Sequence, residues 1–543
     1  MNPSEPSWNL DSLVVKNLGA LPVVLKVIRD LGVRELVDHY CPIREVADYS
    51  HGLVAEVLLV NRLTAPRPLY SIEDWAHEYA VGELFGIDPG KLNDDRLART
   101  LDAISSRLEE IQFAVSERAV RIFGLDVEQV HLDITSFMFE GAYNENDPNF
   151  PEPMRGYNSE QDFRRKQVRT GQAVTRTGNV PIFYTTFDGN RTDSDTLRQV
   201  YLSLSAMRSF SDTKKTVFVG DSKLLAAGNL LFLLRAGVVF VAPGERRQEF
   251  RNEILGLAPT AWKELAYASE TEVKKRRTTP ESEWNRFWVQ EGTETLTDRE
   301  TGVEFSFRKL IIRSSEEVRA ATKSRNRQLA KAEEELSKVR NGIPRYYKTE
   351  DQVAKKVDKI LTTRRVQAFY KIEITTLDGQ PHIEWDRDEI AIEKAELTSG
   401  CYPLQTNLPK EKSADDVLKI QKDQYRVEHR FSDWKGPLKV CPIFLKNNNR
   451  IAALLTLTGM ALTVLSLIEH RVREEMGDKD GFATGFLPEN RRSRPTGKKI
   501  LLTLSSVMAL VPRHEPRIVH IANITSLAQK LFDIFDVDPK KLI

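Results

Sequence analysis

The sequence predicts an α/β protein in which a mixed sheet is flanked by helices. Residues 127–137 alternate between apolar and polar side chains, which is typical of a half-buried strand. Two further strand-like segments flank the turn residues 177–179, as expected for a hairpin. Helical segments then alternate with the short apolar runs 216–222 and 238–243. A hairpin sheet followed by alternating helices and strands predicts a layered α/β domain.

The segment that precedes this sheet, residues 1–125, is predicted to be a helical domain. Residues 18–40 and 51–63 carry apolar side chains at three- and four-residue spacing, which gathers them on one face of a helix. Asn93 stands before a third such segment and is followed by two acids, the pattern of a helix N-terminus. We therefore expect residues 1–125 to form a helical domain.

The character of the chain changes after Pro243. Residues 245–395 contain a basic run, strands of mixed polarity and a charged helix over 314–341. Because that helix is polar on all sides, we expect it to be solvated or to face DNA rather than a core. We predict an α+β insertion domain over 245–395, a return to the α/β layer over 396–475 and a helical C-terminal region over 476–543.

Composition and charge restrict the class of protein. The net charge of the 543 residues is +1, so a nucleic-acid-binding surface has to be local. The three cysteines, Cys41, Cys401 and Cys441, are far apart, which indicates a reducing compartment and argues against a structural zinc site. The N-terminal residues show no secretion signal, so a cytoplasmic protein is expected.

One segment, residues 451–468, is free of charge and just long enough to span a membrane. Its threonines, serine and glycine dilute its hydrophobicity, and Arg450 and Glu469 flank it closely. We therefore predict a buried core helix and no membrane partner.

The segment 413–435 is predicted to form one helix, which a Gly-Pro pair then stops. Ser413 is a good N-cap and is followed by two acids in the first turn. Glu428 and Lys435 lie on one line beside the apolar stripe, about 10 Å apart along the helix. A glutamate and a lysine placed in this way on one helix are most often ordinary surface residues, so a function for them needs further evidence.

Two aspartates at strand ends supply that evidence. Asp133 ends the alternating strand, and Asp221 follows a short apolar run. Each by itself is most often a turn or cap residue. Acids at the ends of neighbouring strands can meet at one edge of a sheet, and Glu428 from a helix edge can complete a set of oxygen ligands. Such a set suits two Mg²⁺ ions, which promote in-line attack on a phosphodiester.

The order Asp133, Asp221 and Glu428-x6-Lys435 resembles that of DDE transposases of bacterial insertion sequences, in particular the group with a Tyr-x2-Arg-x3-Glu-x6-Lys signature. The likeness covers about residues 20–510 and lies in the stretches LDITSF, GYNSEQ, QVRTGQAVTRTGNVPIFYTTFDGNRTDSDTL, VFVGDSKLLAAGNLLFLL, YPLQTN and YRVEHRFSDWKGPLKVCPIFL. It implies a ribonuclease-H-like catalytic domain, an α/β mixed sheet with flanking helices. Residues 126–244 and 396–475 would form this domain, interrupted by the insertion domain.

The resemblance also implies an activity and partners. Asp133, Asp221 and Glu428 would be the catalytic residues and would hold two Mg²⁺ (or Mn²⁺) ions, while Lys435 would contact a phosphate at the transposon end. The enzyme would cleave DNA at insertion-sequence ends and transfer the strands. Its partners would be double-stranded DNA with terminal inverted repeats and a target DNA, and the helical domain over residues 1–125 would be a candidate for binding the DNA ends. Joining two ends in one event implies a homodimer on DNA, in the bacterial cytoplasm at the nucleoid.

The chain departs from the signature at two positions. The Tyr and Arg positions of the signature hold Gln421 and Gln424, and Tyr425 and Arg426 beyond them are candidate substitutes for the DNA contacts. Two alternatives stay open: a catalytically inactive DNA-binding relic, and a metal-dependent phosphohydrolase built on the turn at Asp221.

A local basic surface is expected in the insertion. Phosphate contacts are favoured by a run of four basic residues, Lys274, Lys275, Arg276 and Arg277. Trp284 and Trp288 follow closely and would share one face if their segment were helical. They would then either stack on a nucleic-acid base or form a small hydrophobic core.

Overall fold

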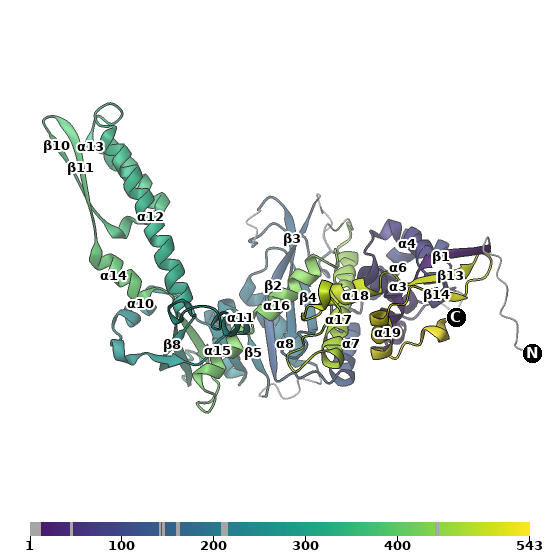
Figure 1. Cartoon of the computed structure of the whole chain (residues 1–543). Coiled ribbons are helices and arrows are strands. Elements are labelled where there is room, and N and C mark those ends of the chain that lie inside the picture. Colours follow the sequence, from purple (N-terminus) through teal and green to yellow (C-terminus); the bar gives the residue numbers. More distant parts are fainter. Residues whose placement is uncertain are drawn as a thin grey trace, which may run out of the picture. The chain divides into compact units, whose positions relative to one another are not determined.

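The computed structural model describes residues 12–43, 47–140, 143, 147–158, 163–207, 215–439, 443 and 445–543. The chain divides into two compact units, one of Met1–Val239 with Asp423–Ile543 and one of Phe240–Lys422. Both combine helices with sheet, so the protein has a mixed α/β fold (Figure 1). The second unit contains the predicted insertion, 245–395, and continues beyond it to Lys422.

The sheet of the first unit is mixed, as predicted. Across it run β4 (Pro181–Phe187), β3 (Lys166–Thr175), β2 (Gln129–Phe139) and β5 (Val217–Val219). The pairs β4–β3 and β3–β2 are antiparallel, whereas β2–β5 is parallel. The predicted hairpin is confirmed: Gly178 and Asn179 join β3 to β4 with φ values of 73° and 51°. Glycine and asparagine tolerate this left-handed conformation better than other residues do.

Helices cover both faces of this sheet. On one face α8 (Asp193–Ser205) packs against β2, β3 and β4, and a Cβ placed at Gly171 would lie 2.4 Å from Val200 of α8. On the other face lie α16 (Tyr425–Lys435) and α17 (Asn448–Met476). Tyr184 of β4 contacts both, because it stacks edge-on against Trp434 and fills the space left by Gly459. The sheet is therefore buried between helical layers.

The helix α17 is the central element of this unit. Among the described residues it is the one helix long and apolar enough to span a membrane by length and composition, and its most apolar 18-residue window is entirely buried. It packs against the N-terminal helices, β4 and α16. The prediction of a buried core helix over 451–468 is confirmed.

The N-terminal part of the chain is mainly helical. Its helices are α1 (Leu21–Asp30), α2 (Val33–Tyr40), α3 (His51–Thr64), α4 (Ile72–Glu78), α5 (Val81–Phe85), α6 (Asp94–Ser105) and α7 (Leu108–Ile122). Asn93 caps α6 by accepting a hydrogen bond from the backbone N–H of Arg96, as its sequence position predicts. The helices α1, α3, α6 and α7 pack against α17, so they share a core with the sheet-bearing part of the chain.

The C-terminal region is not wholly helical, which corrects the prediction for 476–543. Besides α18 (Gly497–Leu504) and α19 (Ser526–Ile534) it contains β13 (Met508–Pro512) and β14 (His520–Ala522). The strand β13 pairs on one side with β14 and on the other with β1 (Leu13–Asn17). The strands β13 and β14 are too short to be recognised from local sequence, and the second partner of β13, the strand β1, lies almost the whole chain length away.

The other strands of the nine-stranded sheet pair in antiparallel fashion, and the second unit also contains a separate two-stranded hairpin. The order of these other strands is β6 (Val239–Pro243), β12 (Cys401–Thr406), β9 (Glu304–Ser314), β8 (Phe287–Thr297) and β7 (Lys263–Leu265). The hairpin is formed by β10 (Tyr370–Leu377) and β11 (Gln380–Arg387). The helices are α10 (Gln248–Leu255), α11 (Glu270–Lys275), α12 (Ser315–Asn341), α13 (Glu350–Arg364), α14 (Glu389–Thr398) and α15 (Ala414–Lys422).

The charged helix α12 is not solvated on all sides, which corrects a second prediction. Leu329, Leu336 and Val339 are buried in a core shared with α13 and with the β10–β11 hairpin. Figure 1 shows α12 and α13 beside that hairpin. The apolar stripe is narrow and the rest of the helix strongly charged, so the average polarity concealed it.

The predicted single helix over 413–435 is two helices, α15 and α16. The break falls at Asp423 and Gln424. The side-chain amide of Gln424 donates to the Leu132 carbonyl oxygen at 2.8 Å, so this residue bonds to β2. Glu428 consequently lies in the first turn of a short helix rather than late in a long one.

Candidate active site

Asp133 lies within β2, which continues to Phe139, and not at the end of its strand, which corrects the expectation from the sequence. It is largely shielded from water. Its Oδ1 accepts a hydrogen bond of 2.7 Å from the backbone N–H of Ile134. Burial chiefly raises the pKa of the Asp133 carboxyl to about 7; the hydrogen bond from Ile134 opposes this rise, and the negative charges of Asp221, Glu428 and Asp193 contribute to it. The three predicted site acids are therefore near enough to interact, and a fourth acid joins them. We call these four residues the acidic cluster.

Asp221 follows β5, the strand parallel to β2, after one intervening residue, Gly220. It caps the short helical turn Ser222–Leu225 by accepting a 2.8 Å hydrogen bond from the backbone N–H of Lys223. Burial raises its pKa, and the charge of Asp193 adds to the increase, while Lys223 acts in the opposite direction. Asp221 therefore has a structural role as an N-cap and also belongs to the acidic cluster.

Glu428 reaches the cluster from α16, which packs against β2 and β3. Its side chain is exposed, in contrast to the partly shielded position expected from the sequence. Within the described part of the chain its carboxylate has no hydrogen-bond or ion-pair partner. Glu428 is thus the member of the cluster that is least held in place.

Asp193 was not predicted as a site residue. It is the first residue of α8, follows the N-cap Thr192 and pairs with Arg169 of β3. Its charge raises the pKa of both Asp133 and Asp221. The sequence signal was ambiguous, because acids in the first turn of a helix are expected for capping alone.

Gln172 lies directly opposite Asp133 in the β2–β3 register, so both side chains extend from the same face of the sheet. It is 0% exposed. Neither its side-chain oxygen nor its nitrogen has a hydrogen-bond partner in the described structure. Since buried polar groups are normally paired, an unpaired amide beside the acidic cluster is a second feature that the sequence did not disclose.

The donor chemistry of the acidic cluster suits a hard divalent cation, because carboxylate oxygens are what Mg²⁺ prefers. The pKa values of Asp133 and Asp221 are raised in part by the charges of neighbouring acids, a repulsion that a bound cation relieves. Among the residues that the structure describes, no group of three or more His, Cys, Asp or Glu is arranged to hold a metal ion. Cation binding would therefore require side-chain movement, for which exposed Glu428 is best placed.

The two glutamines at the departing signature positions differ in their surroundings. Gln424 bonds to the Leu132 carbonyl, and its side-chain oxygen lies 3.0 Å from Nδ1 of His131. Burial lowers the pKa of His131 to about 4. The side-chain oxygen of Gln421 is buried without a partner in the described structure. Gln424 thus attaches the start of α16 to the strand that carries Asp133.

Tyr425 and Arg426 are placed differently from each other. Tyr425 is 53% exposed. The Arg426 guanidinium donates to Oδ1 of Asn179 at 2.7 Å and to Oδ1 of Asp423 at 3.1 Å. Arg426 therefore links α16 to the turn of the β3–β4 hairpin, and its charge is already paired within the protein.

Arg430 provides a second and stronger link, which the sequence did not reveal. It is 0% exposed and donates to the carbonyl oxygens of Gly178 and Asn179 at 3.1 and 2.7 Å. It also bonds to Glu469 of α17 at 2.9 Å. Glu469 in turn accepts from the backbone N–H of Gly497 at 2.8 Å. This network fixes the helix that carries Glu428.

Lys435 is the last residue of α16. Its Nζ lies 5.8 Å from the ring centroid of Phe137, which belongs to β2. The two residues of the predicted Glu428–Lys435 line are therefore on one continuous helix, as expected, and that helix ends at Gly436.

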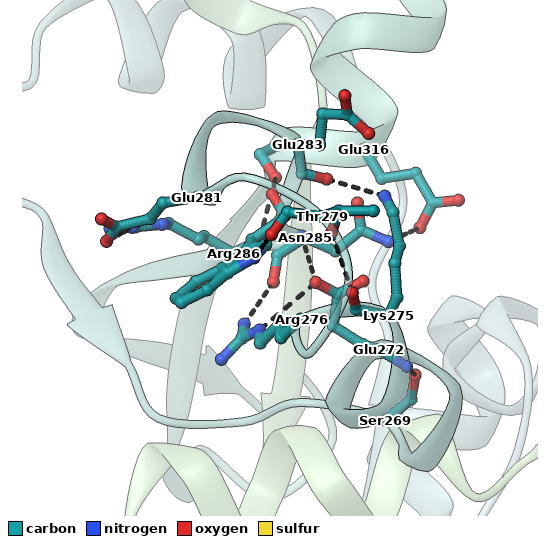
Figure 2. Close-up of polar contacts among 12 residues, drawn as sticks. Ser269, Glu272, Lys275, Arg276, Thr279, Glu281, Glu283, Asn285, Arg286 and Glu316 are labelled. Carbon is teal, nitrogen blue, oxygen red and sulfur yellow. Dashed lines mark hydrogen bonds and ion pairs between the residues drawn. The ribbon is translucent and has the colours of Figure 1, made fainter.

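Two residues of the basic run in the second unit hold a loop by internal contacts (Figure 2). Lys275 donates to the Glu283 carbonyl oxygen at 2.7 Å, and Arg276 donates to Glu272 and to the Asn285 carbonyl oxygen. Lys274 and Arg277 are exposed. The run is thus divided between two residues that fix a loop and two that face solvent.

The two tryptophans after this run do not share a helix, which corrects that expectation. Trp284 precedes β8, and its ring lies 5.1 Å from the Arg276 guanidinium and 5.8 Å from that of Arg286. Trp288 is within β8, opposite Arg313 of β9. A proline and a short turn at Glu281–Glu283 replace the expected helix.

Comparison with known proteins gives two matches. A family model described as a domain of unknown function (DUF4277) matches residues 13–114. Among solved structures, a piggyBac transposase in a synaptic complex with hairpin DNA is similar at 8% sequence identity and a TM-score of 0.38, over 90% of this chain and 81% of that one. No curated protein matches the chain. Neither match assigns an activity to the acidic cluster.

Proposed function

We propose that this chain is a DDE-type transposase, which cleaves DNA at the ends of an insertion sequence and transfers the strands to a target DNA. One observation carries the proposal. Asp133, Asp221 and Glu428, singled out from the sequence, interact: the charges of the other two raise the pKa of Asp133. Perturbed, mutually repelling acids are characteristic of functional sites. The DUF4277 domain, which is found in transposase-like proteins, agrees with this reading.

In this proposal Asp133, Asp221 and Glu428 hold two Mg²⁺ or Mn²⁺ ions, which supply activation of the attacking oxygen and stabilisation of the leaving oxygen. Asp133 is positioned by its strand and Asp221 by its capping hydrogen bonds. Glu428, whose side chain is exposed, would supply the third carboxylate. Lys435, at the end of the same helix, contacts a phosphate of the transposon end.

The finer features belong to the same proposal. The first unit's sheet is proposed to be ribonuclease-H-like, with the second unit as its insertion. The chain acts as a homodimer on terminal inverted repeats, in a bacterial cytoplasm. These features rest on the family resemblance of the sequence rather than on the acidic cluster.

One alternative is favoured by a specific observation. Gln424 is bonded to β2 and Arg426 to Asn179, so neither side chain is available as the signature's phosphate contact. A DNA-binding relic without catalysis would look the same at these positions. A phosphohydrolase, by contrast, would use Asp221 without Glu428.

Cleavage of DNA that carries the repeats flanking this gene tests the proposal. We expect strand cleavage with Mg²⁺ and none with EDTA. Asp133→Asn, Asp221→Asn and Glu428→Gln should each abolish cleavage and retain DNA binding, because an amide keeps the shape of the side chain and loses its charge. Binding without cleavage by the unaltered chain would identify a relic, and cleavage that survives Glu428→Gln would favour the phosphohydrolase.

A further inference from the structure

A groove of the first unit lies outside the acidic cluster. It consists of two adjoining cavities of about 470 and 400 Å³ that share Arg62, Pro66 and Lys439 in their walls. The end of α3 and the segment after it form one side, and another is formed by residues 436–439, Ile443 and Leu445. The helix α18 closes the second cavity with Lys498 and Leu502.

Three cations of this groove lack a carboxylate partner within the described structure: Arg62, Lys439 and Lys498. We call the groove that these three cations line the basic groove. Arg62 is partly buried, and its guanidinium donates a long hydrogen bond of 3.5 Å to the Lys439 carbonyl oxygen. Burial lowers the pKa of its guanidinium. A desolvated charge without a counter-charge is unfavourable, so this position is suited to an anion that the protein itself does not supply.

The neighbouring cations show that the absence of partners is selective. Arg67 pairs with Glu78 at 3.3 Å, and Arg450 donates to both carboxylate oxygens of Asp102 at 2.8 Å. Both line the first cavity. The unpaired positive charge is therefore concentrated where the two cavities join and in the second cavity.

The shape and position of the groove indicate an extended anion. Its walls begin at Gly436, immediately after Lys435, so it continues from the end of the helix that carries Glu428. Tyr70 in the first cavity is 72% exposed and Leu502 in the second is 65% exposed. Apolar surface between unpaired cations suits the sugars and bases of a nucleic-acid strand, whose phosphates neutralise the cations.

We propose that the basic groove binds consecutive phosphates of a DNA strand beyond the cleavage site. This inference rests on the proposed function, since it assumes that DNA is the substrate. It assigns to Arg62, Lys439 and Lys498 a role in holding the DNA end, separate from the chemistry of the acidic cluster.

The test measures binding of duplex DNA carrying the flanking repeats to the full chain with Asp133→Asn, in EDTA, over a range of salt concentrations. Each phosphate contact contributes about 0.9 to the slope of log K against log salt. Adding Arg62→Gln, Lys439→Gln and Lys498→Gln should reduce the slope by nearly 3 and weaken binding on the order of 10²-fold at about 0.1 M salt.

A matched control removes three exposed charges elsewhere in the first unit, by Arg121→Gln, Lys530→Gln and Lys540→Gln. It has the same net charge as the groove variant and should leave the slope nearly unchanged. Because Arg62 is partly buried, the double variant Lys439→Gln/Lys498→Gln is measured beside the triple one. Its slope should fall by nearly 2 while its melting temperature stays at that of the Asp133→Asn parent.

Neutral methylphosphonates placed one at a time in the DNA then locate the contacts. Without the groove substitutions, a consecutive group of positions on one strand should lose affinity, and the groove variant should show no further loss there. An unchanged salt slope in both groove variants would overturn the inference and leave the proposed function standing. Failure of the Asp133→Asn chain to bind this DNA would instead contradict the proposed function. Binding of polyglutamate is measured in parallel. If the groove substitutions abolish polyglutamate binding and leave DNA binding intact, the inference is overturned and the groove is assigned to an acidic protein segment.

Discussion

Replacing Asp133 by asparagine is predicted to stabilise the cation-free protein, and to do so more strongly as the pH rises. The pKa of Asp133 is raised from 3.8 to about 7, chiefly by burial and then by its acidic neighbours. A carboxyl whose pKa is raised on folding contributes its full stabilisation at pH values below its pKa in the unfolded chain. This stabilisation is lost as the pH rises through the pKa of the carboxyl in the folded protein.

The magnitude follows from this difference. A rise of about 3 pH units, at about 1.4 kcal/mol for each, gives at most about 4 kcal/mol. Because Asp133 keeps some contact with solvent, we expect about 2–4 kcal/mol. Asparagine has nearly the same shape and no charge, so the Asp133→Asn variant should match the unaltered chain at about pH 4 and exceed it in stability at about pH 8.

The assay is urea unfolding of the full chain in EDTA at several pH values between about pH 4 and pH 8. Unfolding is monitored by fluorescence, and the unfolding free energy is taken from the first transition. Asp102→Asn is the matched control, because hydrogen bonding to Arg450 lowers the pKa of Asp102. This control should lose stability at high pH and approach the unaltered chain as the pH falls. Equal stability of Asp133→Asn and the unaltered chain at about pH 8 would refute the argument that Asp133 lies among desolvated acids.

Four further predictions follow from the same contacts. Mg²⁺ should raise the melting temperature of the unaltered chain more at about pH 8 than at about pH 6, because protons compete for Asp133, and a calorimetric scan of Asp133→Asn should show no such response. Gln172→Leu should raise the unfolding free energy by about 1–3 kcal/mol, since it removes a buried unpaired amide, and a loss of stability would show that the amide is paired. Arg430→Met should cost about 3–5 kcal/mol in urea unfolding, because Glu469 keeps a buried charge that has lost a partner, whereas an exposed salt bridge would cost under about 1 kcal/mol. Lys435→Ala should lower the salt slope of DNA binding by about 1, and an unchanged slope would make Lys435 an ordinary surface residue.

Local patterns allowed several elements to be predicted from the sequence. The β3–β4 hairpin follows from a Gly-Asn turn between strand-like segments, and α17 from an uncharged run of sufficient length. The position of Asp221 just beyond β5 follows from an acid after a short apolar run, whereas Asp133 lies within β2 and not at its end. In each case a short segment contains both the apolar pattern and the residue that ends it.

Elements that depend on distant partners could not be predicted in this way. The strand β13 exists by pairing with β1, and the buried stripe of α12 becomes visible only with α13 beside it. The break between α15 and α16 depends on the hydrogen bond from Gln424 to β2, which no helical pattern indicates. Asp193 could not be predicted as a site residue, because an acid in the first turn of a helix is already expected from its interaction with the helix N-terminus.

The central claim is that Asp133, Asp221 and Glu428 together bind the catalytic cations, and substitution by cysteine tests it most directly. A thiolate is a poor ligand for Mg²⁺ and a better one for Mn²⁺, so direct ligands reveal themselves by a change in metal preference. Cleavage of the repeat-bearing DNA is measured for Asp133→Cys, Asp221→Cys and Glu428→Cys in each metal. The account predicts that all three variants are inactive with Mg²⁺ and regain cleavage with Mn²⁺. Full cleavage with Mg²⁺ by any of the three would contradict it.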